Sequence, residues 1–335
     1  MPRRARLDAP GALQHIIVRG IERQRIFRDD EDRNALLTRF GRVLTESSTP
    51  CYAWALLPNH VHLLLQTGRV PLSTVMRRVL TGYAVTFNRR HRRHGPLFQN
   101  RYKSILCEQE PYLLELARYI HLNPLRAQRV RGLDELDNYP YAGHGALMGK
   151  RAVAWQAVGF VLGQFSDREA AARRAYRAFV TEGIALGRRP ELVGGGLIRS
   201  LGGWTAAHSR RRGSPRMKGD ERILGESAFV LHTLALAEEE LAWVEQLARR
   251  GVDLEAVARQ AADAFGVTPE RIFGNERVRT VAGARSLFCY WAVRDLRQTT
   301  ASLARRLNLS QPAVSMAVRR GADVARERGV RLEIK

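Results

Sequence analysis

The chain has 335 residues, 45% of them hydrophobic, and carries 55 Lys and Arg against 33 Asp and Glu, a formal net charge of +22. This length and apolar content favour two globular parts over a disordered polymer. The excess of cations, almost all arginine, is larger than solubility requires and indicates a phosphate-rich partner such as a nucleic acid.

The cysteines and the first residues indicate the cell interior. Cys51, Cys107 and Cys289 stand singly, so the sequence predicts neither a disulfide framework nor a cysteine zinc site. Residues 1–12 are basic but lack the apolar core of a signal peptide, and no apolar stretch is long enough to cross a bilayer. We therefore expect a cytoplasmic, nucleoid-associated protein with no membrane partner.

The first 125 residues alternate strand-like and helix-like patterns. Short apolar runs predict strands, and amphipathic runs predict helices between them. This interleaved order favours an α+β fold in which helices cover one face of an antiparallel sheet. The predicted strands are 14–18, 51–57, 60–66 and 101–107, and the predicted helices are 29–47, 72–91 and one that Pro111 opens.

Three parts are expected along the whole chain. The first is the α+β domain, at 1–150. In 151–224 the pattern turns helical and then becomes rich in glycine and arginine, which predicts a helical extension followed by a basic linker. From 225 to 335 the chain is helical without strand-like alternation, which predicts a second, all-α domain.

Two histidines stand next to a predicted turn in the first domain. Pro58 and Asn59 favour a turn between two strands. Because side chains alternate along a strand, His60 and His62 point to the same face. Two neutral imidazoles at this spacing can bind one divalent ion. A lone His-x-His pair is also typical of surface or partly buried histidines, so the motif by itself leaves both interpretations open.

The register of this hairpin determines what surrounds the two histidines. If Leu56 lies opposite Val61, then Tyr52 and Trp54 join the apolar face. The histidine face then receives only small or aliphatic side chains, from 53, 55 and 57, which leaves room for an ion and a phosphate. His15, on the first strand, is expected to be a packing residue or a phosphate contact.

A tyrosine lies off the apolar stripe of the helix that Pro111 opens. Residues four apart share a helix face, so Tyr119 lines up with Glu115 and with Asn123, whose amide oxygen is a candidate third metal ligand. A tyrosine oxygen can attack a phosphodiester and leave a phosphotyrosine, a step that needs no external energy. The chain accordingly has no GxxxxGK[ST] phosphate loop. Tyr112 is the rival nucleophile, and most tyrosines at helix edges only pack.

Several motifs of the first domain point to one family. They are RG at 19–20 with RQ at 23–24 and IFRDD at 26–30, LPNHVHLLL at 57–65, FQNRYKS at 98–104 and YIHLNPLRA at 119–127. With these motifs the segment from about 10 to 150 resembles the REP-associated tyrosine transposases, within the single-tyrosine HUH transposase superfamily. Together the motifs are far more specific than the histidine pair alone.

This resemblance implies a ferredoxin-like sheet, a nucleophile at Tyr119 and a metal site at His60 and His62, with the Asn123 amide as third ligand. It also implies Mg²⁺ or Mn²⁺ as the cofactor and hairpin-forming single-stranded DNA as the substrate. The shorter relatives end soon after the tyrosine domain, so both a monomer and a homodimer stay open. The candidate DNA contacts in this domain are Arg19, Arg101 and Lys103.

Two short helices near the end of the chain have the proportions of a helix-turn-helix. They are predicted at 300–307 and 311–320, with Ser310 as the N-cap of the second. The stretch resembles the C-terminal DNA-binding domain of the bacterial replication initiator, which implies recognition of a duplex flank. A plain helical bundle with a basic surface is the alternative. The candidate DNA contacts here are Arg277, Arg279, Gln311, Ser315, Arg319 and Arg320.

Three functions fit these observations. The favoured one is a transposase-type strand transferase that cleaves and rejoins single-stranded hairpin DNA through a 5′-phosphotyrosine on Tyr119, with a divalent metal. A non-catalytic, sequence-specific DNA-binding regulator on the same fold would need no metal. A metallohydrolase would use a metal-bound water and would be indifferent to the loss of the Tyr119 hydroxyl. The joint presence of His60, His62, Tyr119 and Asn123 favours the strand transferase.

Overall fold

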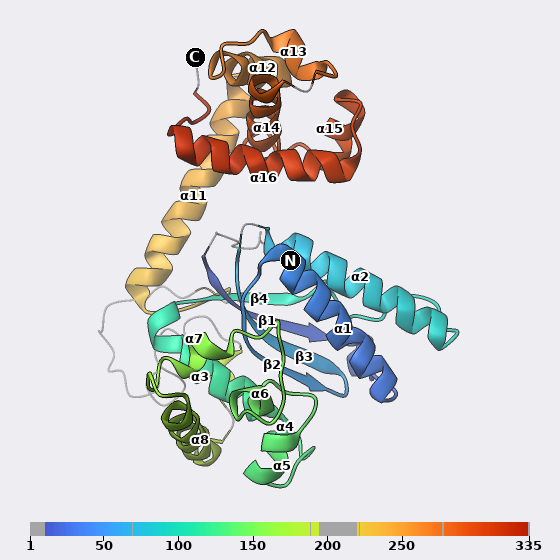
Figure 1. Cartoon of the computed structure of the whole chain (residues 1–335), viewed down its shortest axis with the longest axis vertical. Coiled ribbons are helices and arrows are strands. Elements are labelled where there is room, and N and C mark those ends of the chain that lie inside the picture. The colour runs from blue at the N-terminus through green and yellow to red at the C-terminus, as the bar shows by residue number, and fades with distance from the viewer. Residues whose placement is uncertain are drawn as a thin grey trace, which may run out of the picture. The chain divides into compact units, whose positions relative to one another are not determined.

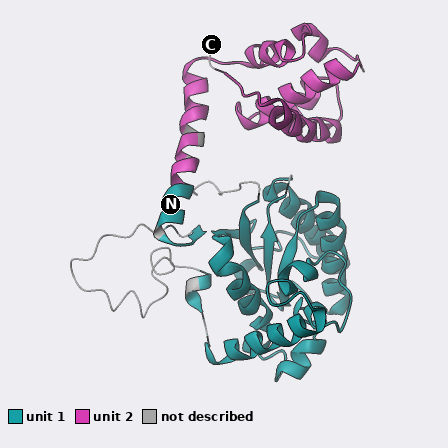
Figure 2. Ribbon diagram, turned by 60° about the vertical axis from the view of Figure 1, so that its left-hand side comes forward, with its two compact units in different colours: residues 1–233 teal, residues 234–335 magenta. Residues whose placement is uncertain are grey.

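The computed structural model describes residues 11–68, 70–187, 189–193, 220, 222–276 and 278–333. The chain forms two compact units, residues 1–233 and 234–335 (Figure 2). The boundary lies within one helix, α11 (Ser227–Arg249), whereas the sequence pattern placed breaks at 150 and 224. Most of the basic linker expected before 225 lies outside the described residues.

A five-stranded sheet forms the centre of the first unit (Figure 1). Its strand order is β2-β3-β1-β4-β5, with β4 and β5 parallel and the other neighbours antiparallel. The four strands predicted from apolar runs are confirmed, whereas β5 is too short to carry such a pattern. The strands are β1 (Leu13–Arg19), β2 (Cys51–Leu57), β3 (His60–Gln66), β4 (Lys103–Cys107) and β5 (Ile223–Leu224).

Helices cover both faces of this sheet (Figure 1). The predicted α+β class is confirmed, but the expectation of helices on one face is wrong. Every residue of β2 and most of β3 are buried, so neither face can be left to water. One face packs on α1 (Asp30–Ser47) and α2 (Leu72–Arg90). The other packs on α3 (Gln109–His121), α7 (Val158–Leu162) and α8 (Glu169–Ala185).

The hairpin of β2 and β3 has the predicted register at its turn. Leu56 lies opposite Val61, and Ala55 lies opposite His62. The register shifts between Cys51 and Ala53, however, and Tyr52 packs in the core on the α3 side of the sheet. Tyr52 was expected on the opposite face, because simple alternation does not anticipate a β-bulge.

The segment after residue 150 packs against the sheet of the first unit. Tyr176 and Val180 of α8 are fully buried in one core with Leu116 of α3. His121 Nδ1 lies 2.7 Å from the hydroxyl of Tyr176. The remaining short helices of this unit are η1 (Ile21–Arg23), α4 (Asn123–Arg126), α5 (Leu133–Asn138), α6 (His144–Leu147) and η2 (Pro190–Leu192).

The described part of the second unit is helical, which confirms the predicted all-α region. Its core is made by α12 (Leu254–Asp263), α13 (Pro269–Phe273), α14 (Arg279–Arg294), α15 (Thr300–Arg306) and α16 (Gln311–Arg328). A Cβ on Gly321 would lie 2.0 Å from the backbone oxygen of Ser286, so α14 and α16 meet at a position that requires glycine. None of the described helices is long and apolar enough to cross a membrane.

The predicted helix-turn-helix pair corresponds to α15 and α16. Ser310 caps α16 as expected, since its Oγ accepts a hydrogen bond from the Ala313 amide at 3.3 Å. α16 continues to Arg328, eight residues beyond the predicted end at 320. Val314 and Ala317 face the core, and Val318 is partly buried against it.

Candidate active site

Three elements bring the predicted catalytic side chains together: β1, β3 and α3. His60 and His62 of β3 lie with ring centroids 5.1 Å apart. The ring of Tyr119, on α3, lies 5.9 Å from that of His62 and 6.0 Å from that of His15, on β1. The strand alternation and the helix periodicity thus converge on one site, on the α3 side of the sheet.

A chain of hydrogen bonds fixes the protonation of His62. His15 Nδ1 lies 3.2 Å from the carbonyl oxygen of Leu192, which can only accept, so this nitrogen carries the proton. In a neutral imidazole the other nitrogen, His15 Nε2, then accepts, and it lies 3.0 Å from His62 Nδ1. His62 therefore donates from Nδ1, and its Nε2 keeps a lone pair for a metal ion.

A second contact gives His60 the same tautomer. Its Nδ1 lies 2.7 Å from the side-chain oxygen of Asn59. The Asn59 amide is oriented by its nitrogen, which donates to the carbonyl oxygen of Arg23 at 2.9 Å. His60 thus donates from Nδ1 and also keeps a lone pair on Nε2. Both histidines of the motif are in the tautomer that suits metal ligation through Nε2.

The surroundings keep both histidines neutral. Burial, followed by the positive charge of Arg19, lowers the pKa of His60 to about 4. Burial also lowers the pKa of His62 well below its ordinary value, with smaller contributions from His15, His60 and Arg19. Arg19 lies directly opposite His60 in the pairing of β1 with β3. Neutral imidazole is the form that binds metal, so these shifts favour ligation at neutral pH.

We expect the metal-free protein to lose stability as the pH falls from about 7 to about 4.5. Unfolded histidines take up protons near pH 6.5, whereas folded His60 stays neutral until about pH 4. Between these values the unfolded state binds more protons, so the free energy of unfolding falls as the pH falls. His60 alone accounts for up to roughly 3 kcal/mol over the whole interval. Urea unfolding at several pH values, with a chelator present, measures the effect.

A His60→Gln variant is the control for this pH dependence, which should be shallower in the variant. Asp29 does not contribute in the same interval. Hydrogen bonding to Arg90 lowers the pKa of Asp29 from 3.8 to about 2, so its stabilisation is lost only below pH 4. Equal slopes for the variant and the parent protein would show that His60 does not stay neutral in the fold.

Asn123 is buried at the start of α4, two residues beyond the end of α3. Its Nδ2 is a buried atom without a hydrogen-bond partner among the described residues. A half-turn of the amide exchanges its nitrogen and oxygen, so this side chain offers either a donor or a ligand oxygen. Glu115, expected on the same helix face, instead pairs with Arg118 at 2.5 Å and with Arg189 at 3.3 Å.

The described residues contain no group of three or more His, Cys, Asp and Glu side chains that could hold a metal ion. Two histidines and an amide would make a different set of donors. The tautomers of His60 and His62 fit such a set, as does the amide of Asn123, whose nitrogen has no hydrogen-bond partner among the described residues. These donors are all neutral, and a site of this kind suits an ion that also binds an anionic phosphate.

The two candidate tyrosines lie in different surroundings. Tyr119 lies beside the histidines, and the guanidinium of Arg126 sits 5.3 Å from its ring centroid. Tyr112 is half-buried at the start of α3, where burial and then the charge of Glu108 raise its pKa. A raised pKa and acidic neighbours disfavour a phenolate, so the surroundings favour Tyr119 over Tyr112.

The predicted DNA contacts of the first unit are exposed. Arg19 ends β1 beside His60, and Arg101 precedes β4. Lys103 is paired with Ile17 in the sheet, and its Nζ donates to the carbonyl oxygen of Val193 at 2.7 Å. Arg19 and Lys103 both lie on the histidine face of the sheet, but Lys103 is already engaged within the protein.

The predicted DNA contacts of the second unit differ in whether their side chains already form hydrogen bonds within the protein. Gln311 is exposed but donates to the Thr300 hydroxyl at 3.0 Å. Ser315 is only partly exposed, and its hydroxyl donates to the carbonyl oxygen of Gln311 at 3.0 Å. Both side chains would have to exchange these bonds for a base. The exposed cations of this set are Arg279, Arg319 and Arg320, and Arg277 lies outside the described residues.

Sequence reasoning did not assign His15 and Arg126 to the site. His15 was expected only to pack or to touch a phosphate, and its link to Leu192 spans 177 positions. Arg126 belongs to the YIHLNPLRA motif but carries no signal that it lies over Tyr119. Only the alternation that places His15 on the His62 face of the sheet could have suggested a role.

Comparisons with known proteins show what part of the first unit resembles. No curated protein matches the chain. A solved structure described as the REP-associated tyrosine transposase bound to a REP hairpin aligns with 45% of this chain and 87% of its own, at 16% identity and a TM-score of 0.38. Residues 11–123 match the family model described as "Transposase IS200 like". The transposase resemblance inferred from the motifs is thus confirmed for residues 11–123, which are similar to the IS200-like transposases.

Proposed function

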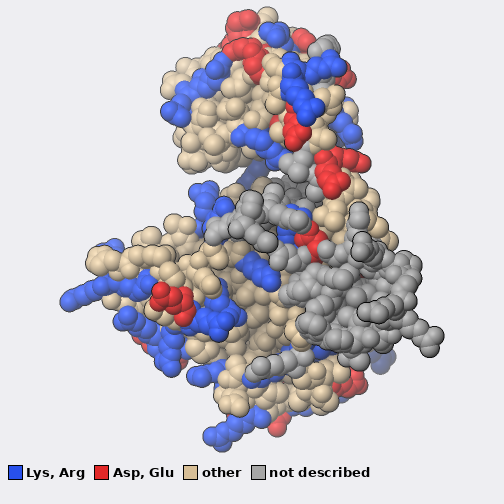
Figure 3. Space-filling view, turned by 180° about the vertical axis from the view of Figure 1, so that it is seen from behind, with Lys and Arg blue, Asp and Glu red and all other residues tan. Residues whose placement is uncertain are grey.

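We propose that the chain cleaves and rejoins single-stranded DNA by using Tyr119 as the nucleophile, with a divalent ion held by His60, His62 and Asn123. The observation that carries the proposal is the placement of the Tyr119 ring 5.9 Å from His62, whose Nε2 keeps its lone pair. The match to a transposase family supports DNA as the substrate. The face of the molecule drawn in Figure 3 carries many Lys and Arg side chains, which also supports DNA as the substrate.

The proposed reaction exchanges one phosphoester bond for another. The Tyr119 oxygen forms a bond to the scissile phosphorus, and the bond from that phosphorus to the 3′ oxygen breaks. The phenol proton is released, and the departing 3′ oxygen takes up a proton to become a hydroxyl. The DNA is left with its 5′ phosphate on Tyr119, and attack by a 3′ hydroxyl reverses the step without external energy.

Each side chain of the site has a proposed role in this reaction. Bound Mg²⁺ or Mn²⁺ would polarise the phosphate and offset the charge that develops on it. His15 and Asn59 hold the two histidines in the tautomer that presents Nε2. Arg126 keeps a positive charge against the Tyr119 ring, close to where negative charge develops.

The proposal gives His15 a positioning role that can be measured apart from catalysis. We expect His15→Phe to weaken Mn²⁺ binding about ten- to a hundredfold, because loss of a hydrogen bond that orients a metal-binding histidine has effects of that size. Titration calorimetry with Mn²⁺, without DNA, measures the affinity. His15→Gln keeps a side-chain acceptor for His62 and should recover part of the Mn²⁺ affinity. Unchanged Mn²⁺ affinity in His15→Phe would contradict the relay from Leu192 to His62.

Two other functions are distinguished by a single experiment. The protein is incubated with single-stranded hairpin DNA and Mn²⁺, and the products are separated on a denaturing gel. We expect a band of protein covalently joined to DNA, with a free 3′ hydroxyl on the released strand. A metallohydrolase would cut the DNA without a protein adduct, and a non-catalytic regulator would leave it intact.

The second unit is proposed to read a flanking duplex through α16. Exposed Arg319 and Arg320 of α16 and exposed Arg279 of α14 would contact the DNA. We expect a chain ending after residue 233 to keep adduct formation but to lose its preference for a duplex flank. Each lost phosphate contact should reduce the slope of affinity against salt by about 0.9.

Binding to single-stranded and flanked hairpins at several salt concentrations compares this shortened chain with the full one. The shortened chain keeps β5, whose Ile223 and Leu224 are buried in the sheet. If its duplex preference and salt slope equal those of the full chain, the second unit does not read DNA.

A further inference from the structure

A hollow lined by arginines lies beside His60. The arginines are Arg23, Arg25 and Arg129. Their side chains are exposed, and none forms an ion pair with a carboxylate in the part of the chain that the structure describes. We call this hollow the arginine groove. Its lining includes Arg23, Arg25, Arg129, Pro58, Asn59 and His60.

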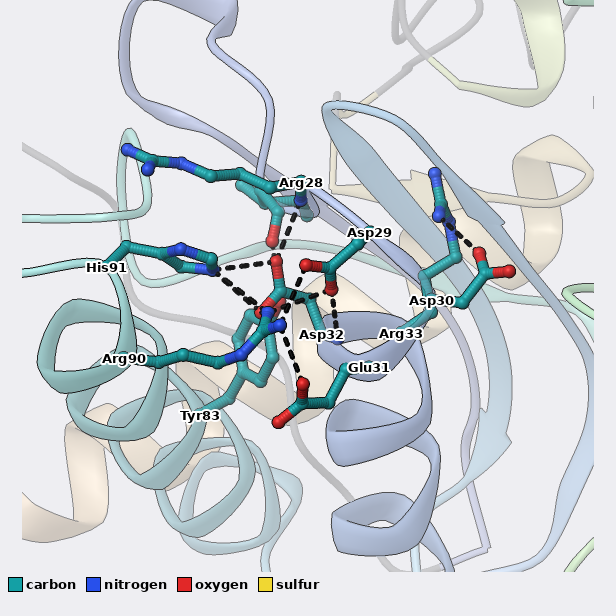
Figure 4. Close-up of polar contacts among 10 residues, drawn as sticks. Arg28, Asp29, Asp30, Glu31, Asp32, Arg33, Tyr83, Arg90 and His91 are labelled. Carbon is teal, nitrogen blue, oxygen red and sulfur yellow. Dashed lines mark hydrogen bonds and ion pairs between the residues drawn. The ribbon is translucent and has the colours of Figure 1, made fainter.

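Arg90, elsewhere in this unit, lies among acidic residues and is paired with them. Arg90 binds Asp29, Glu31 and Asp32 at 2.6 to 2.8 Å (Figure 4). In the groove's own loop the only acid is Glu22, and its carboxylate accepts from the Gln24 amide at 3.2 Å instead. Three guanidinium groups around one hollow repel one another, so the groove favours an anionic occupant.

The loop that carries two of these arginines has an uncommon backbone. Glu22 and Arg23 have φ angles of 52° and 61°, in the left-handed region that non-glycine residues rarely adopt. A Cβ on Gly20 would lie 2.2 Å from the backbone oxygen of Gln24, so the loop closes tightly on a glycine. Backbone of this kind persists only where the surrounding structure holds it.

Hydrogen bonds hold the loop at both ends. The Gly20 amide donates to the carbonyl oxygen of Asn59 at 2.8 Å, and the Ile26 amide donates to that of Pro58 at 2.9 Å. The Tyr83 hydroxyl donates to the Ile26 carbonyl oxygen at 2.5 Å. Just beyond, the Arg28 amide donates to buried Asp32, the carboxylate that Arg90 and His91 also hold (Figure 4).

The same hydrogen bonds couple the groove to the histidine pair. The Asn59 side chain donates to the Arg23 carbonyl oxygen and accepts from His60 Nδ1. The loop of Arg23 and Arg25 is therefore fixed to the turn that precedes His60. An anion in the groove would lie next to the metal ligand and in a set position relative to it.

We propose that the arginine groove is a subsite for the phosphodiester backbone of the single strand adjacent to the scissile phosphate. The position of that phosphate rests on the proposed function. Guanidinium forks match phosphate oxygens, and the described lining contains no Phe, Tyr or Trp on which a base would stack. The groove thus binds the strand without reading its sequence.

The test measures binding without cleavage. Full-length Tyr119→Phe protein in a chelator is titrated with fluorescent dodecathymidylate at several salt concentrations. We expect Arg23→Gln, Arg25→Gln and Arg129→Gln each to weaken binding about tenfold and to reduce the salt slope by about 0.7. The matched control is Arg131→Gln, which removes an exposed arginine two residues from Arg129 and outside the groove. Arg131→Gln should change affinity less than twofold.

A second probe identifies the phosphate as the group bound. A dodecathymidylate whose internal phosphates are neutral methylphosphonates should bind the parent and the three groove variants equally weakly. Arg23→Lys should keep most of the salt slope, because it keeps the charge. The proposal is overturned if Arg131→Gln is as damaging as the groove variants, or if the groove variants still lose affinity for the neutral oligonucleotide.

The failure of this proposal and that of the proposed function have different signatures. With Mn²⁺ and Tyr119 present, groove variants should raise the DNA concentration needed for half-maximal adduct formation about tenfold and leave the maximal rate within twofold. Loss of binding in the groove variants without any adduct in the parent would sink the tyrosine mechanism and keep the groove. Normal adduct formation by the parent protein with unchanged DNA binding in the groove variants would support the tyrosine mechanism and overturn the groove.

Discussion

Replacing Tyr119 with phenylalanine should abolish the protein–DNA adduct, with a loss on the order of a thousandfold or more. The substitution removes one oxygen from a ring that is only partly buried and leaves its contacts with His15 and His62 in place. Affinity for single-stranded DNA in a chelator should stay within about twofold of the parent protein, because binding does not need the hydroxyl. Denaturing gels and fluorescence anisotropy measure the two quantities.

Tyr112→Phe is the matched control for this prediction. Tyr112 lies on the same helix, is also partly buried, and has a pKa raised by burial and by Glu108. Its hydroxyl should be dispensable for adduct formation. A Tyr119→Phe protein that forms the adduct at the parent rate would remove Tyr119 from the mechanism, and loss of the adduct in Tyr112→Phe would point to Tyr112 instead.

Replacing either histidine of the motif should also block cleavage. We expect His60→Ala or His62→Ala to weaken Mn²⁺ binding about a hundredfold or more and to reduce adduct formation in parallel. A chelator should stop adduct formation by the parent protein, and added Mn²⁺ should restore it. Calorimetry without DNA and adduct yield against Mn²⁺ concentration measure the two effects.

His94→Ala is the control for the histidine variants, because His94 is exposed after α2 and takes no part in the site. It should bind Mn²⁺ and form the adduct as the parent protein does. Excess Mn²⁺ should recover part of the activity of His60→Ala, because His62 keeps its bond to His15. Adduct formation in the chelated parent protein would show that the two histidines are structural.

Local periodicity was sufficient to predict which way the candidate site residues face within their own strand or helix. Alternation along β3 placed His60 and His62 on one face, and the helical repeat placed Tyr119 off the apolar stripe of α3. Both are properties of single elements, so they need no knowledge of the tertiary structure. The turn at Pro58 and Asn59 also set the register that puts Ala55 opposite His62.

Contacts between distant segments could not be predicted in this way. The bond from His15 to the Leu192 carbonyl oxygen joins the first strand to a short helix 177 positions later. Helices on the second face of the sheet come partly from the segment after residue 150, whose own pattern says only that it is amphipathic. The bulge that turns Tyr52 to the α3 side depends on pairing with β3, which alternation alone does not encode.

The residue that becomes attached to DNA is the most direct test of the proposed chemistry. The adduct formed with single-stranded hairpin DNA and Mn²⁺ is digested with nuclease and protease, and the nucleotide-bearing peptide is sequenced by mass spectrometry. The placement of Tyr119 beside His62 predicts a 5′-linked nucleotide on Tyr119. A nucleotide on Tyr112 or on any other residue, or cleaved DNA with no modified peptide, would contradict it.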